Sequence, residues 1–168
     1  MYSSPAPRRV KESDLAEVHR LRLAFLDESE LVLRPDAVAA WRDYDILWWN
    51  QFIHRCATSP EEYLAVVPSP EHPDALLALG YAHHTGSVVT FGMLYVDPPY
   101  RGRGFGAAVL EHRTLWALRT GALSMECWIT DGNVVATDLH ESEGWQRTDT
   151  TRVTNPPATE TLWEFPIL

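Results

Sequence analysis

The chain has 168 residues, of which 45% are hydrophobic and 22% are charged, and this composition is typical of one globular domain. It contains no apolar run as long as the roughly 20 residues that a membrane-spanning helix needs, and residues 1–9 contain no apolar stretch of the signal-peptide type. We therefore expect a cytoplasmic protein that does not bind a membrane. The net charge is −9 and there is no Lys/Arg-rich run, so we expect no nucleic-acid partner, because nucleic-acid affinity depends on basic residues that neutralise phosphate.

The N-terminal third is predicted to contain a short strand and two helices. Residues 1–7 are expected to be a flexible leader, and residues 8–11 a short strand. Ser13 is a plausible N-cap for the first helix, and a loop is expected over residues 27–34. Pro35 suits the first turn of a second helix. The apolar residues at helical spacing are Leu15, Val18, Leu21 and Phe25 in the first helix and Val38, Trp41, Trp48, Phe52 and Cys56 in the second.

Three strand-like segments follow, over residues 63–67, 76–83 and 87–96, and their short connections predict antiparallel neighbours. Asp97-Pro98-Pro99 ends the third strand, because proline cannot donate to a ladder of hydrogen bonds. A glycine-rich turn over residues 101–106 then leads into a helix that runs to about Arg119. The apolar face predicted for that helix consists of Ala107, Leu110, Thr114, Ala117 and Leu118.

The C-terminal part is predicted to contain a strand over residues 123–129, a short helix over residues 134–141, and a closing pair of strands over residues 145–153 and 161–165. The order is helices, an antiparallel meander, a strand–helix–strand crossover and a hairpin. It indicates an α+β or mixed α/β fold around one sheet. We therefore expect one domain over residues 1–168.

The cysteines and lysines carry little functional signal. Cys56 and Cys127 lie far apart and outside any paired metal-ligand or redox motif, which predicts two reduced, packed thiols and no metal site. Lys11 is the only lysine among 14 basic residues, a bias that favours a bacterial, GC-rich genome.

The strongest functional signal is the segment from Val96 to Gly106. Its glycines allow a ligand to approach the backbone closely, and the first amides of the helix that follows point outward with the positive end of the helix dipole. Arg101 and Arg103 add charge for phosphate oxygens. The segment is therefore interpreted as a site for a pyrophosphate.

Two families of pyrophosphate sites compete for this segment. Gly102, Gly104 and Ala107 fit the dinucleotide fingerprint G-x-G-x-x-[GA], and Glu126 follows about 20 residues later, where that pattern has an acid. However, the dinucleotide fold places its glycines directly after its first strand, whereas here two predicted helices and a meander come first.

The other pattern resembles the GNAT superfamily of acyl-CoA N-acyltransferases. Arg101, Gly104 and Gly106 match that family's loop [QR]-x-x-G-x-[GA]. A later run, Asn133-x-x-Ala136-x-x-Leu139-His140-Glu141-x-x-Gly144-Trp145, is similar to its second motif. The two motifs occur in the expected order, and the helices before them and the hairpin after them also match, so the resemblance covers nearly the whole chain.

The resemblance implies a GNAT-like fold, with a mostly antiparallel central sheet splayed at the coenzyme A site and about four flanking helices. It also implies transfer of an acetyl group from acetyl-CoA to an amine by direct attack in a ternary complex, with no metal. The residues expected to bind acetyl-CoA are Leu94, Tyr95, Val96, Arg101, Gly102, Arg103, Gly104, Phe105, Gly106 and Asn133. Asn133 would otherwise serve only as a helix N-cap.

The general acid and base are less well defined. The family often has a tyrosine where this chain has His140, so the resemblance implies His140 as general acid, with packing as the alternative. Relatives often carry a base where this chain has Gly92 or Thr90, and neither can act as one. His83 and Glu126 are the base candidates we retain, His84 and Asp45 are weaker ones, and a chain of water molecules could replace them all.

The acceptor is expected to be a small-molecule or peptide amine, and a cationic one would suit an acidic protein. In the family the first two helices, the loop between them and the late hairpin border the acceptor. The acidic and aromatic residues of that region are Glu28, Glu30, Asp36, Asp43, Asp45, Trp41, Trp48 and Trp49. They could bind an ammonium group or form a solvated face beside a tryptophan-rich core or homodimer contact. Two rival functions are a non-catalytic acyl-CoA-binding module and a dinucleotide-dependent oxidoreductase.

Overall fold

The computed structural model describes residues 5–29, 45–154 and 158–167. The strands are β1 (Arg8–Arg9), β2 (Glu62–Pro68), β3 (Leu76–Thr85), β4 (Val88–Val96), β5 (Ser124–Thr130), β6 (Gln146–Val153) and β7 (Thr159–Phe165). The α-helices within these ranges are α1 (Leu15–Ser29), α3 (Ile46–Thr58), α4 (Phe105–Arg119) and α5 (Val134–Ser142). Short 3-10 turns occupy Glu12–Asp14 and Pro98–Tyr100.

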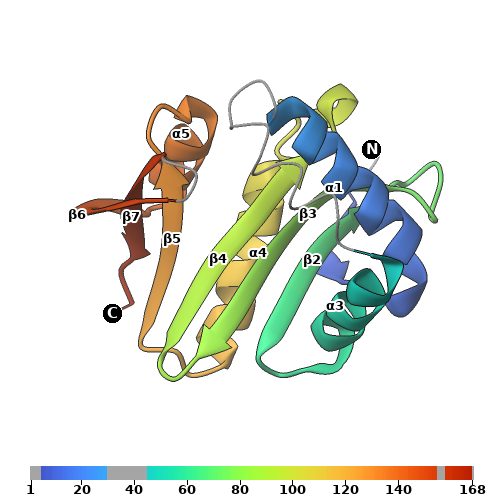
Figure 1. The fold of residues 1–168 in the computed structure, drawn as a ribbon, viewed down its shortest axis with the longest axis horizontal. Coiled ribbons are helices and arrows are strands. Elements are labelled where there is room, and N and C mark those ends of the chain that lie inside the picture. The colour runs from blue at the N-terminus through green and yellow to red at the C-terminus, as the bar shows by residue number, and fades with distance from the viewer. Residues whose placement is uncertain (1–4, 30–44, 155–157, 168) are drawn as a thin grey trace.

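The seven strands form one open sheet in the order β1-β2-β3-β4-β5-β7-β6. All neighbours are antiparallel except β4 and β5, which are parallel and are connected through α4. Figure 1 shows α1 and α3 on one face of the sheet and α4 on the opposite face. This arrangement confirms the predicted mixed α/β fold with its central crossover and its closing hairpin.

Alternating side chains of the strands build a hydrophobic core on each face of the sheet. Leu64, Val66 and Leu79 pack with α1 and α3 on one face. Ala65, Val67 and Ala78 pack with α4 on the other. None of the helices in the described ranges is long and apolar enough to cross a membrane.

Residues 27–29 of the predicted loop are helical instead, because α1 continues to Ser29. Three further local predictions were wrong. Ser13 is not the N-cap of α1. It lies inside the 3-10 turn, where the Asp14 carboxylate accepts the Lys11 amide at 2.7 Å. The second helix was predicted as one long helix that begins near Pro35. Helix α3 instead begins at Ile46 and is capped by Asp45, whose carboxylate accepts the Trp48 amide at 2.8 Å. Pro35, its predicted first residue, lies outside the described residues, as do residues 1–4 of the predicted leader.

The last of these predictions concerns the buried face of α4. The side chains that this helix buries are Phe105, Val109, Leu110, Arg113 and Ala117. Leu118, predicted to be buried, is 46% exposed. The prediction considered only apolar residues and so omitted Arg113, which lies at the centre of the buried face of α4.

Candidate active site

Strands β4 and β5 are paired over only part of their lengths. Their parallel register joins Val88–Phe91 to Ser124–Cys127 and then stops. The following residues of β4 stay paired with β3, through Tyr95 to Leu79 and Val96 to Ala78. The edge of residues 92–96 that faces β5 therefore has no strand partner. It can hydrogen-bond an extended ligand, such as the pantetheine arm of coenzyme A.

A β-bulge lies at the point where the two strands part. Tyr81 pairs with Gly92, whereas Leu79 pairs with Tyr95, so Met93 and Leu94 together face one residue of β3. Met93 has a φ of 51°, a conformation that is uncommon for a side chain of this size. Bulges re-aim backbone groups and often occur beside active sites.

The turn after β4 has the geometry of an anion site. Gly102 and Gly104 have φ values of 72° and 82°, and a Cβ at either position would meet no atom within 4 Å. The first hydrogen bond inside α4 runs from the Ala108 amide to the Gly104 carbonyl at 3.0 Å. The amides of residues 105–107 precede it, so the open side of the turn presents donors and the positive helix end. These features fit the diphosphate of coenzyme A.

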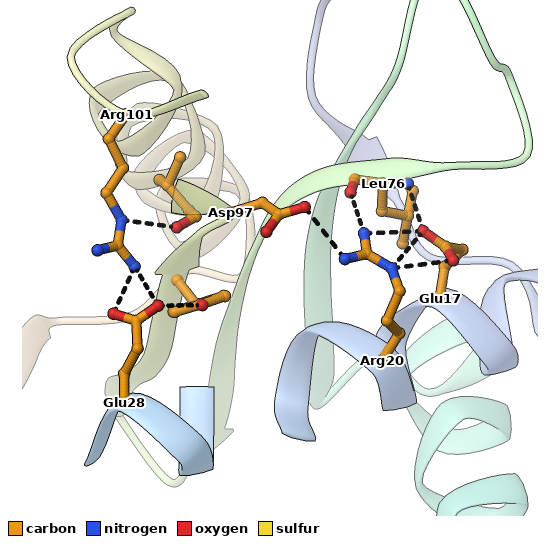
Figure 2. A network of polar contacts seen from close by, with 8 residues as sticks. Glu17, Arg20, Glu28, Leu76, Asp97 and Arg101 are labelled. Carbon is orange, nitrogen blue, oxygen red and sulfur yellow. Dashed lines mark hydrogen bonds and ion pairs between the residues drawn. The ribbon is translucent and has the colours of Figure 1, made fainter. Parts of the chain in front are cut away.

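The two arginines of the turn already have contacts within the protein. Arg101 donates to the Val96 carbonyl at 3.0 Å and to both oxygens of Glu28 on α1 at 2.8 Å (Figure 2). Glu28 also accepts the Tyr95 hydroxyl at 2.5 Å. Arg103 lies over the Tyr100 ring, 5.4 Å from its centre. Burial raises the pKa of Glu28, but the hydrogen bonds from Tyr95 and Arg101 outweigh it and hold that pKa below its ordinary value.

A second ion-pair network holds α1 against the beginning of the turn. Arg20 donates to Asp97 at 3.1 Å and to the Leu76 carbonyl at 3.0 Å. Glu17 contacts Arg20 and accepts the Leu76 amide at 3.0 Å. Figure 2 shows Asp97 and Arg101 side by side, each bonded to a different residue of α1. Helix α1 is therefore attached at two points, Asp97 and Arg101, to the segment that follows β4.

Both base candidates lie in one row across the sheet. His83 pairs with Thr90, and Thr90 pairs with Glu126. Partners in register share a face of the sheet. Met125 and Cys127 point into the core beneath α4, so Glu126 between them lies on the opposite face, the one on which α1 and α3 pack.

The Thr90 hydroxyl donates to Glu126 at 3.1 Å. A Cβ at Gly92, next along β4 on this face, would meet no atom within 4 Å. The row therefore borders open space at the point where the strands part.

His140 is buried, with 3% of its surface exposed. Its Nδ1 lies 2.7 Å from the Ala136 carbonyl and must donate to it, which leaves Nε2 as the acceptor from the Cys127 thiol at 3.6 Å. Burial lowers the pKa of His140 to about 4. The imidazole is therefore neutral near pH 7 and has no proton on Nε2. The general-acid role of His140 stays a prediction, which the variant discussed below tests.

The remaining candidates have structural contacts in the described part of the chain. Asn133 caps α5 by accepting the Ala136 amide at 3.2 Å, and its side chain is exposed. Asp45 caps α3. Trp49 is buried in the core, and Trp48 stacks on Phe52 with ring centres 5.3 Å apart. The candidates outside the described residues are Glu30, Asp36, Trp41 and Asp43. His84 points to the α4 face, away from the row, because it alternates with His83.

Comparison with known proteins identifies the architecture. The model of the acetyltransferase (GNAT) family matches residues 19–145. The chain belongs to this family. Thialysine N-epsilon-acetyltransferase of Mus musculus is 28% identical over 163 residues, covering 82% of this chain and 87% of the relative. The corresponding enzyme of Sus scrofa shows the same values.

Solved structures show the same fold. The PaiA N-acetyltransferase of Thermoplasma acidophilum, solved with coenzyme A, superposes with a TM-score of 0.81 at 14% identity, covering 98% of this chain and all of that one. A spermidine N-acetyltransferase chimera from Vibrio cholerae and hSSAT gives a TM-score of 0.71 at 14% identity, covering 95% of this chain and 94% of that one. The family match and the curated relatives show that this GNAT protein is an acetyl-CoA-dependent N-acetyltransferase. Its described residues contain no group of three or more His, Cys, Asp or Glu that could hold a metal ion.

Sequence reasoning missed two features of this site. It did not foresee that Arg101 contacts Glu28 and the Val96 carbonyl, and the phosphate-binding role of Arg101 stays a prediction. It also did not select Arg113, because a charged residue is not expected on the buried face of a helix, although its position matches the spacing of the buried residues Val109, Leu110 and Ala117. Both features depend on contacts between segments far apart in the chain.

Proposed function

We propose that this GNAT enzyme acetylates the primary amine at one end of a flexible, cationic small molecule. The observation that carries the proposal is the row His83, Thr90, Glu126 on the α1/α3 face, placed beside the gap between β4 and β5. The gap suits the donor, and the row suits an amine that must lose a proton before it attacks. The two substrates would thus meet at the base of the gap and react directly.

The donor side of the proposal rests on backbone groups. The turn amides and the N-terminus of α4 would bind the diphosphate. The edge of residues 92–96 that faces β5, which includes Leu94, Tyr95 and Val96, would bind the pantetheine arm. An amide of this edge aimed at the thioester oxygen would stabilise the developing negative charge by roughly 3 kcal/mol. Asn133, at the start of α5, would add a side-chain contact to the pantetheine arm.

Glu126 is our candidate for the general base. It is partly exposed, and the Thr90 hydroxyl fixes its orientation at 3.1 Å. Because Gly92 leaves the neighbouring position empty, a substrate ammonium or a bridging water can reach the carboxylate. His83, on the other side of Thr90, could take over the proton. The departing thiolate would receive its proton from solvent or from the newly acetylated nitrogen if His140, whose Nδ1 proton is bonded to the Ala136 carbonyl, supplies none.

The acceptor class is supported by charge and by the relatives. Glu126 and its register partner Glu164 on β7 place negative charge on the α1/α3 face, and Glu28 on α1 adds a carboxylate that is paired with Arg101. A molecule with a second cationic group would be attracted by these carboxylates. The named relatives act on thialysine and on spermidine, which share a terminal primary amine on a flexible, cationic chain.

A thiol-release assay with acetyl-CoA over an amine panel tests this proposal. Thialysine, lysine, spermidine, an aminoglycoside and a peptide with a free N-terminus cover the open possibilities. We expect turnover with thialysine or spermidine at a kcat/KM at least about tenfold above that with n-pentylamine, which lacks the second charge. If acetyl-CoA binds but no amine releases thiol, the protein is an acyl-CoA-binding module and the proposal fails.

A further inference from the structure

Arg113 is a buried cation that the acetyl-transfer mechanism leaves unused. Its side chain is 1% exposed in the core between α4 and the sheet. Burial lowers its pKa to about 10, so it stays charged near neutral pH. No carboxylate bonds to it among the residues that the structure describes, and its Nε has no hydrogen-bond partner there. An interior guanidinium without a counter-charge is costly, so its contacts must repay that cost.

Those contacts are at the β-bulge. Nη1 of Arg113 donates to the Tyr81 carbonyl on β3 at 2.8 Å and to the Gly92 carbonyl on β4 at 2.9 Å. Tyr81 and Gly92 are the last partners in register before Met93 and Leu94 bulge outward. One guanidinium nitrogen thus ties the two strands together at the position where the regular ladder is interrupted. The guanidinium carbon also lies 4.8 Å from the centre of the Phe91 ring.

The surrounding sequence makes room for this contact. A Cβ at Gly80, the residue opposite the bulge, would lie 2.9 Å from both Cζ and Nε of Arg113. Gly80 has no positive φ that would require a glycine, so its lack of a side chain is explained by the close approach of Arg113 and of Val109. Gly80, Arg113 and the bulge therefore form one structural unit.

We propose that Arg113 is a positioning residue for acetyl-CoA, which holds the β4 bulge and thereby keeps residues 92–96 apart from β5 for the pantetheine arm. Without the guanidinium, the Tyr81 and Gly92 carbonyls would lose their charge-assisted donor, and the unpaired edge could shift its register or close toward β5. The inference concerns donor binding alone, so it stands or falls independently of the acceptor proposed above.

Calorimetric titration with acetyl-CoA, in the absence of any amine, tests the inference. We expect Arg113→Met, which keeps the aliphatic volume, to raise the Kd for acetyl-CoA by about tenfold or more, because two hydrogen bonds to a charged group are lost. Arg113→Lys keeps the charge with a different geometry and should fall between Arg113→Met and the native protein. In steady state, the KM for acetyl-CoA should rise while the KM for the amine stays unchanged.

Val109→Ala is the matched control. Val109 is fully buried on the same helix and contacts the same position of β3, so its truncation lowers stability without touching the two carbonyls. We expect its Kd for acetyl-CoA to stay within about twofold of native. If Arg113→Met and Val109→Ala lose similar stability and both bind acetyl-CoA normally, Arg113 is only a core residue and the inference is overturned.

A second route covers the case in which Arg113→Met does not fold. Gly80→Ala placed in the Val109→Ala background removes the contact with Val109 but still forces the Arg113 guanidinium to move. We expect this double variant to weaken acetyl-CoA binding by about as much as Arg113→Lys, by the same loss of hydrogen-bond geometry. Native affinity in the folded double variant would contradict the inference.

Discussion

The proposed donor site and the proposed acceptor site of this enzyme come from different parts of the chain. The donor site is local and made of backbone: the end of β4, the glycine turn and the first amides of α4 are continuous in sequence. The acceptor site combines single side chains on β3, β4 and β5, which sheet register aligns, with Glu28 on α1. Binding by backbone groups depends on the conformation of the chain more than on which side chains are present. Binding by side chains depends on the identity of each residue.

Gly104→Asp is expected to have the largest effect, because it acts on the donor backbone. Gly104 has a φ of 82°, which an aspartate adopts only at a cost, and the carboxylate would add negative charge where the diphosphate binds. We expect the Kd for acetyl-CoA to rise at least about 100-fold, on the order of a lost charge-assisted site. Calorimetry with acetyl-CoA and CoA measures it.

Gly86→Asp is the control for Gly104→Asp. Gly86 also has a positive φ, 63°, and open space around it, but it lies in the β3–β4 turn at the far end of the strands. This variant should lose comparable stability and keep its affinity for acetyl-CoA. Unchanged affinity in Gly104→Asp would remove the turn from the account of donor binding.

Glu126→Gln tests the acceptor side. Replacing the carboxylate by an isosteric amide removes the proposed base, so we expect kcat to fall by about 100-fold, the typical contribution of general base catalysis. Acetyl-CoA affinity should stay unchanged, because the side chain lies on the acceptor face. Glu143→Gln, at a position after α5 that is partly exposed, as Glu126 is, controls for the loss of one charge. A normal kcat in Glu126→Gln would assign deprotonation to a chain of water molecules.

Glu28→Gln sharpens the comparison, because Glu28 contacts Arg101 in the proposed donor site and is one of the carboxylates proposed to attract a cationic acceptor. We expect the KM for spermidine or thialysine to rise about fivefold, as for loss of one partly exposed ion pair, with less change for n-pentylamine. Acetyl-CoA affinity should change by less than about twofold if backbone amides, and not the Arg101 side chain, bind the diphosphate. A large loss of acetyl-CoA affinity would show instead that Arg101 binds phosphate and depends on Glu28.

The same contrast explains what the sequence could reveal. The positions of Gly102, Gly104 and Gly106 and the stop at Pro98-Pro99 are local signals, and they predicted the strand, the turn and α4 correctly. The alignment of His83, Thr90 and Glu126 depends on strand register, which no local pattern contains. The burial of Arg113 was missed for a similar reason. A search for apolar periodicity does not select a charged residue, and the carbonyls that bind Arg113 lie on other strands.

His140→Phe is expected to have the smallest effect on the rate. The native imidazole is neutral near pH 7 and bonded within the protein, so we expect kcat to change by less than about threefold, unlike removal of a general acid. Its effect is expected in the pH dependence of stability. The pKa of His140 is about 4 in the folded protein, below the ordinary value of 6.5, so the unfolded chain binds the proton more tightly.

It follows that His140 leaves the folded state unaffected above pH 6.5 and destabilises it progressively as the pH falls from 6.5 toward 4, by up to about 3 kcal/mol. Urea unfolding at pH 7 and pH 5 should show a smaller pH-dependent loss of unfolding free energy in His140→Phe than in the native protein. His72→Gln, at an exposed position, should keep the native pH dependence. If His140→Phe instead loses about 100-fold in kcat at pH 7, then His140 donates the proton to the leaving thiolate, and the tautomer assigned here from its Ala136 and Cys127 contacts is not the one that reacts.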